Sequence, residues 1–242
     1  MRWWLLVVVC ACGRIGFDPI SEHGGDAGNS GSGSDGGGSG SGSGSFQYVQ
    51  GVSTTASTGM TLDVPVIPQM DNSVNVVIIG AGDSDVVSVT DQAGTTYTRV
   101  VGPTTTGAVR QWTYVGAVGV TPTLNTVHVV FDQVAMLPGA MIAEYTGVRA
   151  EVPTSSSAMG QSSTSSAGTL FVVTAPALIV AGNTNAQPGT AGPGAGYTER
   201  VRSGFDDIIM DRVVTTAGTY VATATLTTNH VWTMQAIALS PL

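Results

Sequence analysis

Residues 219–226 read TYVATATL, and this short stretch indicates the fold of the chain. Tyr220, Ala222, Ala224 and Leu226 alternate with valine and threonine, so the two sets point to opposite sides of an extended strand. Residues 126–131, TVHVVF, alternate in the same way. A period of two is typical of a strand with one buried face, and it does not fit the 3.6-residue period of a helix.

Short apolar runs separated by turn residues recur on both sides of these stretches, from residue 46 to the C-terminus. Gly94 and Gly218 stand where a hairpin turn needs a residue of positive φ. We expect an all-β fold, a single antiparallel β-sandwich with either an Ig-like or a jelly-roll strand order. Residues 155–166 and 186–196 are rich in Ser, Gly and Pro and are predicted to be exposed loops. The expected strands are 46–51, 60–67, 74–80, 86–91, 95–101, 109–115, 126–131, 140–145, 170–174, 177–181, 198–202, 208–214, 219–226 and 231–239.

The composition excludes some kinds of partner and some kinds of site. The chain has 242 residues, only 10% of them charged, and a net charge of −8. All of its basic residues are arginines, and they form no run, so nucleic acid is not an expected partner. Both cysteines, Cys10 and Cys12, lie at the N-terminus, and the body therefore has no disulfide and no cysteine-based metal site.

The N-terminus carries an export signal. A basic Met1-Arg2 precedes an apolar run, Trp3–Val9, which is too short to span a bilayer in a helix. The next residues, Val9-Cys10-Ala11-Cys12-Gly13, resemble the lipobox of bacterial lipoproteins. That resemblance implies cleavage before Cys12, a diacylglycerol on its thiol and a fatty acid such as palmitate on its amino group. Cleavage by the ordinary signal peptidase, or a misassigned start codon, is the alternative.

Two features follow the lipobox. Residues 13–19, GRIGFDP, resemble the stretch that follows the lipobox in myxobacterial lipoproteins, and Gly13 after the anchor favours sorting to the outer membrane. Residues 24–45 are almost wholly Gly and Ser and cannot bury apolar area, so we expect a disordered tether. The expected organisation is a signal peptide at 1–11, a lipid-anchored tether at 12–45 and a β-sandwich at 46–242, facing the periplasm or the cell surface.

Several strings within residues 74–239 resemble a β-sandwich module of bacterial secreted and surface proteins. They are DQAGTTYT at 91–98, EYTG at 144–147, DRVV at 211–214 and AGTY at 217–220. These are turn and strand signatures, so the resemblance implies a fold and no catalytic residues.

Two sets of residues are candidates for binding. Asp83, Asp85 and Asp91 are close in sequence, and carboxylates so spaced can share a Ca²⁺; the alternative is that they are solvated turn residues. The second set is the run from Arg110 to Tyr114.

Within that run, Trp112 and Tyr114 lie two residues apart on one strand. Their rings can stack on sugars while Arg110 donates hydrogen bonds; the alternative is that both rings belong to the core.

The sequence contains no complete catalytic motif that we recognise. Residues 76–82, VVIIGAG, begin like a dinucleotide-binding turn but lack its third glycine, and no Ser, Cys or His stands in a hydrolase or zinc motif. We therefore expect a non-catalytic lipoprotein of the cell envelope that displays a binding or adhesion module for a polysaccharide or a surface protein. The only cofactors expected are the lipid and, weakly supported, Ca²⁺. The alternatives are a structural spacer or assembly protein, and an enzyme whose site the sequence does not reveal.

Overall fold

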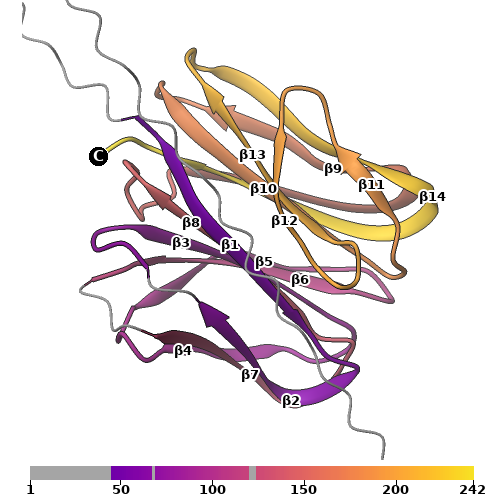
Figure 1. Cartoon of the computed structure of the whole chain (residues 1–242). Coiled ribbons are helices and arrows are strands. Elements are labelled where there is room, and N and C mark those ends of the chain that lie inside the picture. Colours follow the sequence, from indigo (N-terminus) through magenta and orange to yellow (C-terminus); the bar gives the residue numbers. More distant parts are fainter. Residues whose placement is uncertain (1–44, 67–68, 120–123) are drawn as a thin grey trace, which may run out of the picture. The chain divides into compact units, whose positions relative to one another are not determined.

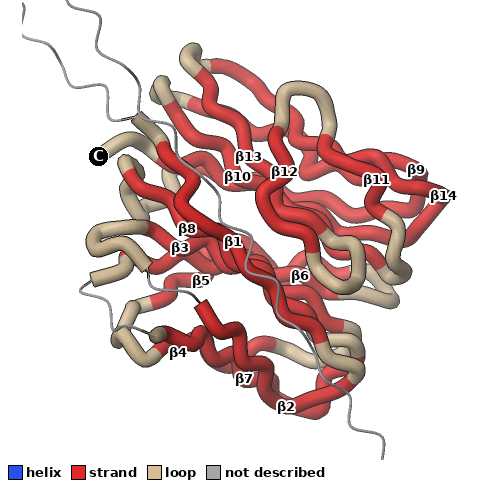
Figure 2. The backbone as a smooth tube through the Cα atoms, viewed as in Figure 1, coloured by secondary structure: helices blue, strands red, loops and turns tan. Residues whose placement is uncertain are grey.

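The computed structural model describes residues 45–66, 69–119 and 124–242, and within them every strand pairing is antiparallel and no helix forms (Figures 1 and 2). The prediction of an all-β antiparallel fold is confirmed. In this part of the chain no helical segment could cross a membrane. The predicted signal peptide, the anchor residue Cys12 and nearly all of the predicted tether lie outside the described residues.

Most of the described strands overlap the predicted ones. They are β1 (Gln47–Thr55), β2 (Thr58–Val66), β3 (Val74–Ala81), β4 (Val86–Asp91), β5 (Tyr97–Thr105), β6 (Arg110–Ala117), β7 (Asn125–Met136), β8 (Gly139–Thr146), β9 (Thr154–Val172), β10 (Ala177–Asn185), β11 (Thr190–Pro193), β12 (Thr198–Arg202), β13 (Ile208–Val214) and β14 (Gly218–Leu239).

The first eight strands form a sandwich of two sheets. The central sheet has the order β1-β8-β3-β6-β5, and it packs against a three-stranded sheet of order β2-β7-β4. β1 pairs with β8, β2 with β7 and β3 with β6, so the pairs are nested as in a jelly roll. Of the two predicted strand orders, the jelly roll is the one this half adopts.

The last six strands form a third sheet on the other side of the central sheet, which we call the C-terminal sheet (Figure 1). Its order is β11-β14-β10-β13-β12, and β9 also pairs with β14. The central sheet is therefore covered on both faces. In β3 all eight residues are buried, with Val77 and Ile79 in one core and Val76 and Ile78 in the other. Burial on both faces explains why β3 is almost wholly apolar, with Asn75 as its one polar residue.

The C-terminal sheet encloses a core of its own because its longest strand bends. β14 has 22 residues, and its register with β9 breaks between Thr225 and His230. The stretch TYVATATL lies before this break, and its Ala222, Ala224 and Leu226 are buried against β10 and β13. The two predicted strands 219–226 and 231–239 are therefore halves of a single bulged strand.

Both predicted loops contain strands. Residues 155–166 lie in β9, where Gly160 faces the ring of Trp232 so closely that a Cβ there would lie 2.8 Å from it. The Trp232 indole N–H also donates to the Ser162 hydroxyl at 3.0 Å. The small side chains of β9 leave room for the ring of Trp232, which lies on the neighbouring strand β14. Residues 186–196 contain β11, which pairs with β14.

Candidate functional site

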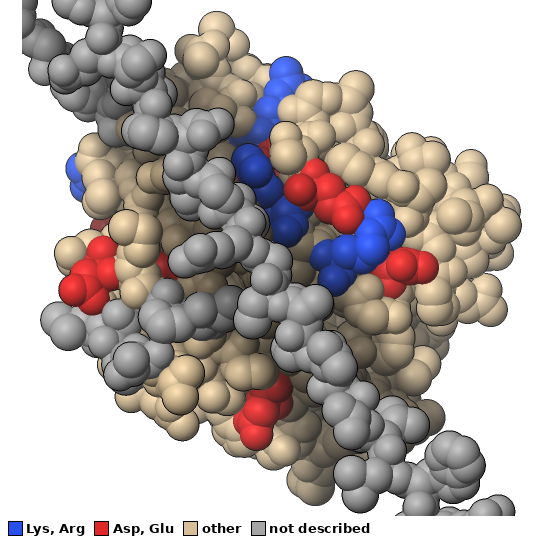
Figure 3. Space-filling view, in the orientation of Figure 1, with Lys and Arg blue, Asp and Glu red and all other residues tan. Residues whose placement is uncertain are grey.

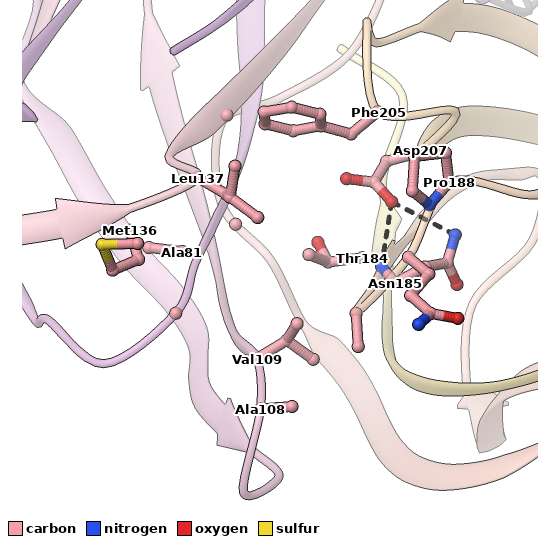
Figure 4. A pocket seen from close by; sticks show the side chains of 15 residues that line it. Ala81, Ala108, Val109, Met136, Leu137, Thr184, Asn185, Pro188, Phe205 and Asp207 are labelled. Carbon is pink, nitrogen blue, oxygen red and sulfur yellow. Dashed lines mark hydrogen bonds between the residues drawn. The ribbon is translucent and has the colours of Figure 1, made fainter. Parts of the chain in front are cut away.

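A pocket of about 110 Å³ lies at one end of the junction between the central and C-terminal sheets (Figure 4). The end of β3, the turn between β7 and β8, and residues 108–109 before β6 form one wall. The end of β10, the segment that follows it and the turn before β13 form the other. The pocket is similar in size to cavities that hold one benzene ring. Its lining is Gly80, Ala81, Gly82, Ala108, Val109, Met136, Leu137, Gly139, Thr184, Asn185, Ala186, Gln187, Pro188, Phe205 and Asp207.

A polar seam between the two sheets leads to this pocket. The Gln111 amide donates to the Gly182 carbonyl at 2.8 Å, and the Thr113 hydroxyl donates to Gln235 at 2.6 Å. These contacts join β6 to β10 and β14. Because buried hydrogen bonds are directional, they set the spacing of the sheets beside the pocket.

The walls of the pocket are mainly apolar. Met136 ends β7 and Leu137 follows it in the β7–β8 turn, and Phe205 lies across from Leu137, in the turn before β13 (Figure 4). Leu137 is 52% exposed, so the mouth presents an apolar rim to solvent. Gly80 makes room at the base, since a Cβ there would lie 2.5 Å from the Thr184 methyl group.

Asp207 brings a carboxyl group into this apolar setting, where the residue is 5% exposed. Its backbone N–H and that of Phe205 both donate to the Ser203 hydroxyl at 3.1 Å, which fixes the turn. Asp207 Oδ1 accepts hydrogen bonds from the backbone N–H of Asn185 at 2.9 Å and from its side-chain amide at 3.2 Å. Figure 4 shows the other oxygen, Oδ2, turned away from Asn185 and toward the pocket.

The pKa of Asp207 is raised from 3.8 to about 8: burial is the main cause, the hydrogen bonds from Asn185 oppose it, and the neighbouring Asp206 adds to the rise. The carboxyl group is therefore protonated at neutral pH. In that state one of its oxygens carries a proton that it can donate, and it keeps capacity to accept.

The amide of Asn185 is itself held in place. It donates to the Thr190 hydroxyl at 2.9 Å, and the Asn183 amide donates to the same hydroxyl at 2.9 Å. Asn183 Oδ1 accepts from the backbone N–H of Ile208 at 2.9 Å. The carboxyl group of Asp207 thus sits on a preorganised base, and its position does not depend on a ligand.

Thr184 supplies a second polar atom. Its side chain is buried beside the pocket, and its Oγ1 has no hydrogen-bond partner among the described residues. A buried hydroxyl without a partner is costly, so a ligand that bonds to it gains stability. Asp207 and Thr184 together can hold a small group that carries hydroxyls or an amine on an apolar body.

The structure places Trp112 and Tyr114 in the core between the central and three-stranded sheets, 0% and 7% exposed. Both rings lie on the face of β6 that packs against the three-stranded sheet, so neither ring offers a stacking surface to a ligand. This corrects the expected aromatic platform, and the core alternative holds. Arg110 is separate from them and forms an ion pair with Asp85 at 2.9 Å. It lies in a shallow hollow that shares Gly82, Ala108 and Met136 with the pocket.

The three aspartates of the expected Ca²⁺ site do not meet. Asp83 and Asp85 precede β4, whereas Asp91 ends it, and six residues of strand span about 20 Å. Asp91 instead accepts hydrogen bonds from Thr95, Tyr97 and Asn125. No group of three or more His, Cys, Asp or Glu side chains among the described residues is placed to hold a metal.

Asp206, Asp207 and Asp211 are close in sequence and Arg212 follows them, but the structure separates their roles. Asp211 is buried and pairs with Arg200 at 2.8 Å, and only Asp207 enters the pocket. The sequence did hold one sign that Asp207 has a fixed position. Ser203-Gly204-Phe205 precedes the pair Asp206-Asp207, and a Ser in such a turn can order the backbone that follows it.

Comparison with known proteins found no matching family model, no matching curated protein and no matching solved structure.

Proposed function

We propose that this chain is a non-catalytic lipoprotein of the bacterial cell envelope, held in the outer membrane through Cys12, that uses its β-sandwich body as a binding module. The lipobox-like residues 9–13 support the anchor. The pocket beside Asp207 is the observation that supports binding. Its lining contains no Ser, Cys, His, Lys or Arg, so the carboxyl group of Asp207 has no second acid–base group beside it in the pocket.

Between the two classes of partner, the pocket favours a polysaccharide over a surface protein. A sugar ring has apolar C–H faces and hydroxyl edges, which match the walls formed by Leu137 and Phe205 and the polar groups of Asp207 and Thr184. The pocket, at about 110 Å³, is no larger than a cavity that holds benzene, so it would take part of one sugar ring and leave the rest at its mouth. We therefore expect recognition of a single residue, such as a chain end or a branch.

A glycan array probed with the full chain in detergent, with and without Ca²⁺, tests this proposal. Ala108→Trp fills the mouth of the pocket, and Ala217→Trp places the same ring in an exposed turn away from it. Binding to a defined glycan that Ala108→Trp abolishes and Ala217→Trp retains is the expected result. No binding in either condition, or binding that Ala108→Trp leaves intact, would contradict it.

A structural role in the envelope is the second candidate, and the burial of the aromatic residues favours it. Trp112, Tyr145 and Phe131 are among the largest fully buried side chains, and Phe171 is the aromatic residue that stands well exposed in the described chain. A chain with this role would bind no glycan on the array, yet it would still carry the lipid on Cys12.

A further inference from the structure

The pocket beside Asp207 adjoins the shallow hollow that contains Arg110. Gly82, Ala108 and Met136 line both, so these three residues form the border between them. Two of the three have almost no side chain, so little stands between the pocket and the hollow. We call this second depression the Arg110 hollow, and the rest of its lining is Asp83, Thr106, Gly107 and Arg110.

The backbone around the Arg110 hollow is held in place without a ligand. In the turn between β5 and β6, the Thr106 hydroxyl accepts hydrogen bonds from the backbone N–H groups of Ala108 and of the residue after it, each at 3.1 Å. At the end of β3, the Gly82 N–H donates to the Met136 carbonyl at 2.9 Å. A Cβ at Gly107 would meet nothing within 4 Å, so the space above this turn is open. The hollow is therefore a preorganised and empty surface beside the mouth of the pocket.

Polar and apolar groups meet in the Arg110 hollow as they do in the pocket. The Arg110 guanidinium forms an ion pair with Asp85 at 2.9 Å, and no other described residue accepts a hydrogen bond from its side chain. It keeps free N–H donors, while Asp85, 52% exposed at its side chain, keeps free acceptor positions. Neighbouring sugar hydroxyls both donate and accept, so such a pair can bind two of them. Met136 is 49% exposed and offers an apolar surface to the C–H face of a ring.

The charge around the Arg110 hollow is negative on balance. Asp83 lines it, Asp85 pairs with Arg110, and the Asp132 carboxylate accepts from the Asp85 backbone N–H at 2.8 Å. Three carboxylates thus surround one guanidinium. On the face that carries β12, by contrast, acidic side chains lie beside basic ones (Figure 3), and both arginines of β12 have a carboxylate partner. An acidic sugar in the Arg110 hollow would be repelled, whereas a neutral one would not.

We propose that the Arg110 hollow is a second sugar subsite, which takes the residue linked to the one in the pocket, and that the two together select a neutral disaccharide unit. This inference rests on the proposed function, in which the pocket takes part of a sugar ring and leaves the rest at its mouth. The linked residue then lies outside the pocket, where Arg110, Asp85 and Met136 can contact it. Full affinity therefore needs two linked residues.

A glycan array that offers each sugar singly and as a disaccharide tests this proposal with the full chain in a sugar-free detergent. The probes are glucose, galactose, mannose, N-acetylglucosamine and galacturonate, each alone and as a dimer. We expect one neutral dimer to bind about tenfold more tightly than its single residue, because the Arg110 hollow adds charge-assisted hydrogen bonds. Neither galacturonate probe should bind.

Two variants separate the Arg110 hollow from the pocket. Arg110→Met and Asp85→Asn each remove one partner of the ion pair, and each should weaken dimer binding about tenfold while single-residue binding stays the same. Arg149→Met is the matched control, because Arg149 donates to the Pro241 carbonyl and lines neither depression; it should change neither affinity. Melting temperatures from circular dichroism show whether the variants keep their fold.

The outcomes distinguish this inference from the proposed function. Equal affinity for a sugar and its dimer, binding of galacturonate, or variants that keep their melting temperature and weaken both affinities alike would overturn the second subsite and leave the pocket as a binding site. Binding of no sugar on the array would overturn both.

Discussion

Replacing Asp207 by asparagine is expected to remove the strongest pH dependence of stability in the described part of the chain. The folded protein keeps the Asp207 proton up to a pKa of about 8, whereas the unfolded chain loses it near 3.8. Between these values unfolding releases a proton, so the free energy of unfolding falls as the pH rises. The asparagine of the Asp207→Asn variant does not titrate, and its Oδ1 can accept the same two bonds from Asn185.

The size of the change in the free energy of unfolding follows from the difference in the pKa of Asp207 between the folded and unfolded states. One pKa unit corresponds to about 1.4 kcal/mol, so the contribution of Asp207 falls by about 4 kcal/mol between pH 5 and pH 8. The side chain is buried, so solvent screening does not reduce this figure much. The Asp207→Asn variant is therefore expected to gain about 4 kcal/mol relative to the unsubstituted chain over that interval.

Urea denaturation of the full chain at pH 5, 6, 7 and 8 measures this difference. Asp83→Asn, at an exposed turn, is the matched control, because it removes a carboxylate without altering the pocket. Its stability is expected to follow that of the unsubstituted chain at every pH. Parallel curves for the Asp207→Asn variant and the unsubstituted chain would show that water reaches the carboxyl group and that the account of the pocket is wrong.

Three further outcomes are expected. Burial would raise the pKa of Asp91, but hydrogen bonds from Asn125, Thr95 and Tyr97 outweigh burial and lower the pKa. In urea denaturation at pH 7, Asp91→Ala should therefore lower the free energy of unfolding by about 2 kcal/mol. This loss should shrink as the pH falls below 3.8, because the carboxyl group then becomes protonated. Trp112→Ala should lower the free energy of unfolding by about 3–5 kcal/mol, because it leaves a cavity between the central and three-stranded sheets. A Cβ at Gly51 would lie 2.3 Å from the Val201 side chain, so Gly51→Ala should lower the melting temperature, while Gly107→Ala, which meets nothing within 4 Å, should not.

The fold class and most strands could be predicted because a period of two survives wherever one face of a strand is buried. The third sheet could not be predicted, because strands with a period of two occur both in sandwiches of two layers and in stacks of three. Residues 155–166 of β9 were missed because the inner face of this part of the strand is mostly Ser, Gly and Ala, and the bulk that buries it comes from Trp232, 70 residues away from Ser162. Local hydropathy therefore indicated a loop where the tertiary structure makes a strand.

The candidate site was harder to predict. Alternation showed that Trp112 and Tyr114 share a face but not which sheet covers that face. The pocket forms where the turn before β13 meets the end of β10 and the β7–β8 turn, three segments far apart in sequence. Asp207 is buried only because of that meeting, and an acidic pair after a turn looks solvated when read alone.

The proposed function depends most on the proposed lipid anchor at Cys12, because that anchor would determine where the pocket is displayed. Metabolic labelling with palmitate compares the unsubstituted chain with Cys12→Ala and with Cys10→Ala, which keeps the anchor residue. Label on the unsubstituted chain and on Cys10→Ala, and none on Cys12→Ala, is the predicted result. Label that survives Cys12→Ala, or an unlabelled parent chain, would contradict the assignment of the protein as an envelope lipoprotein.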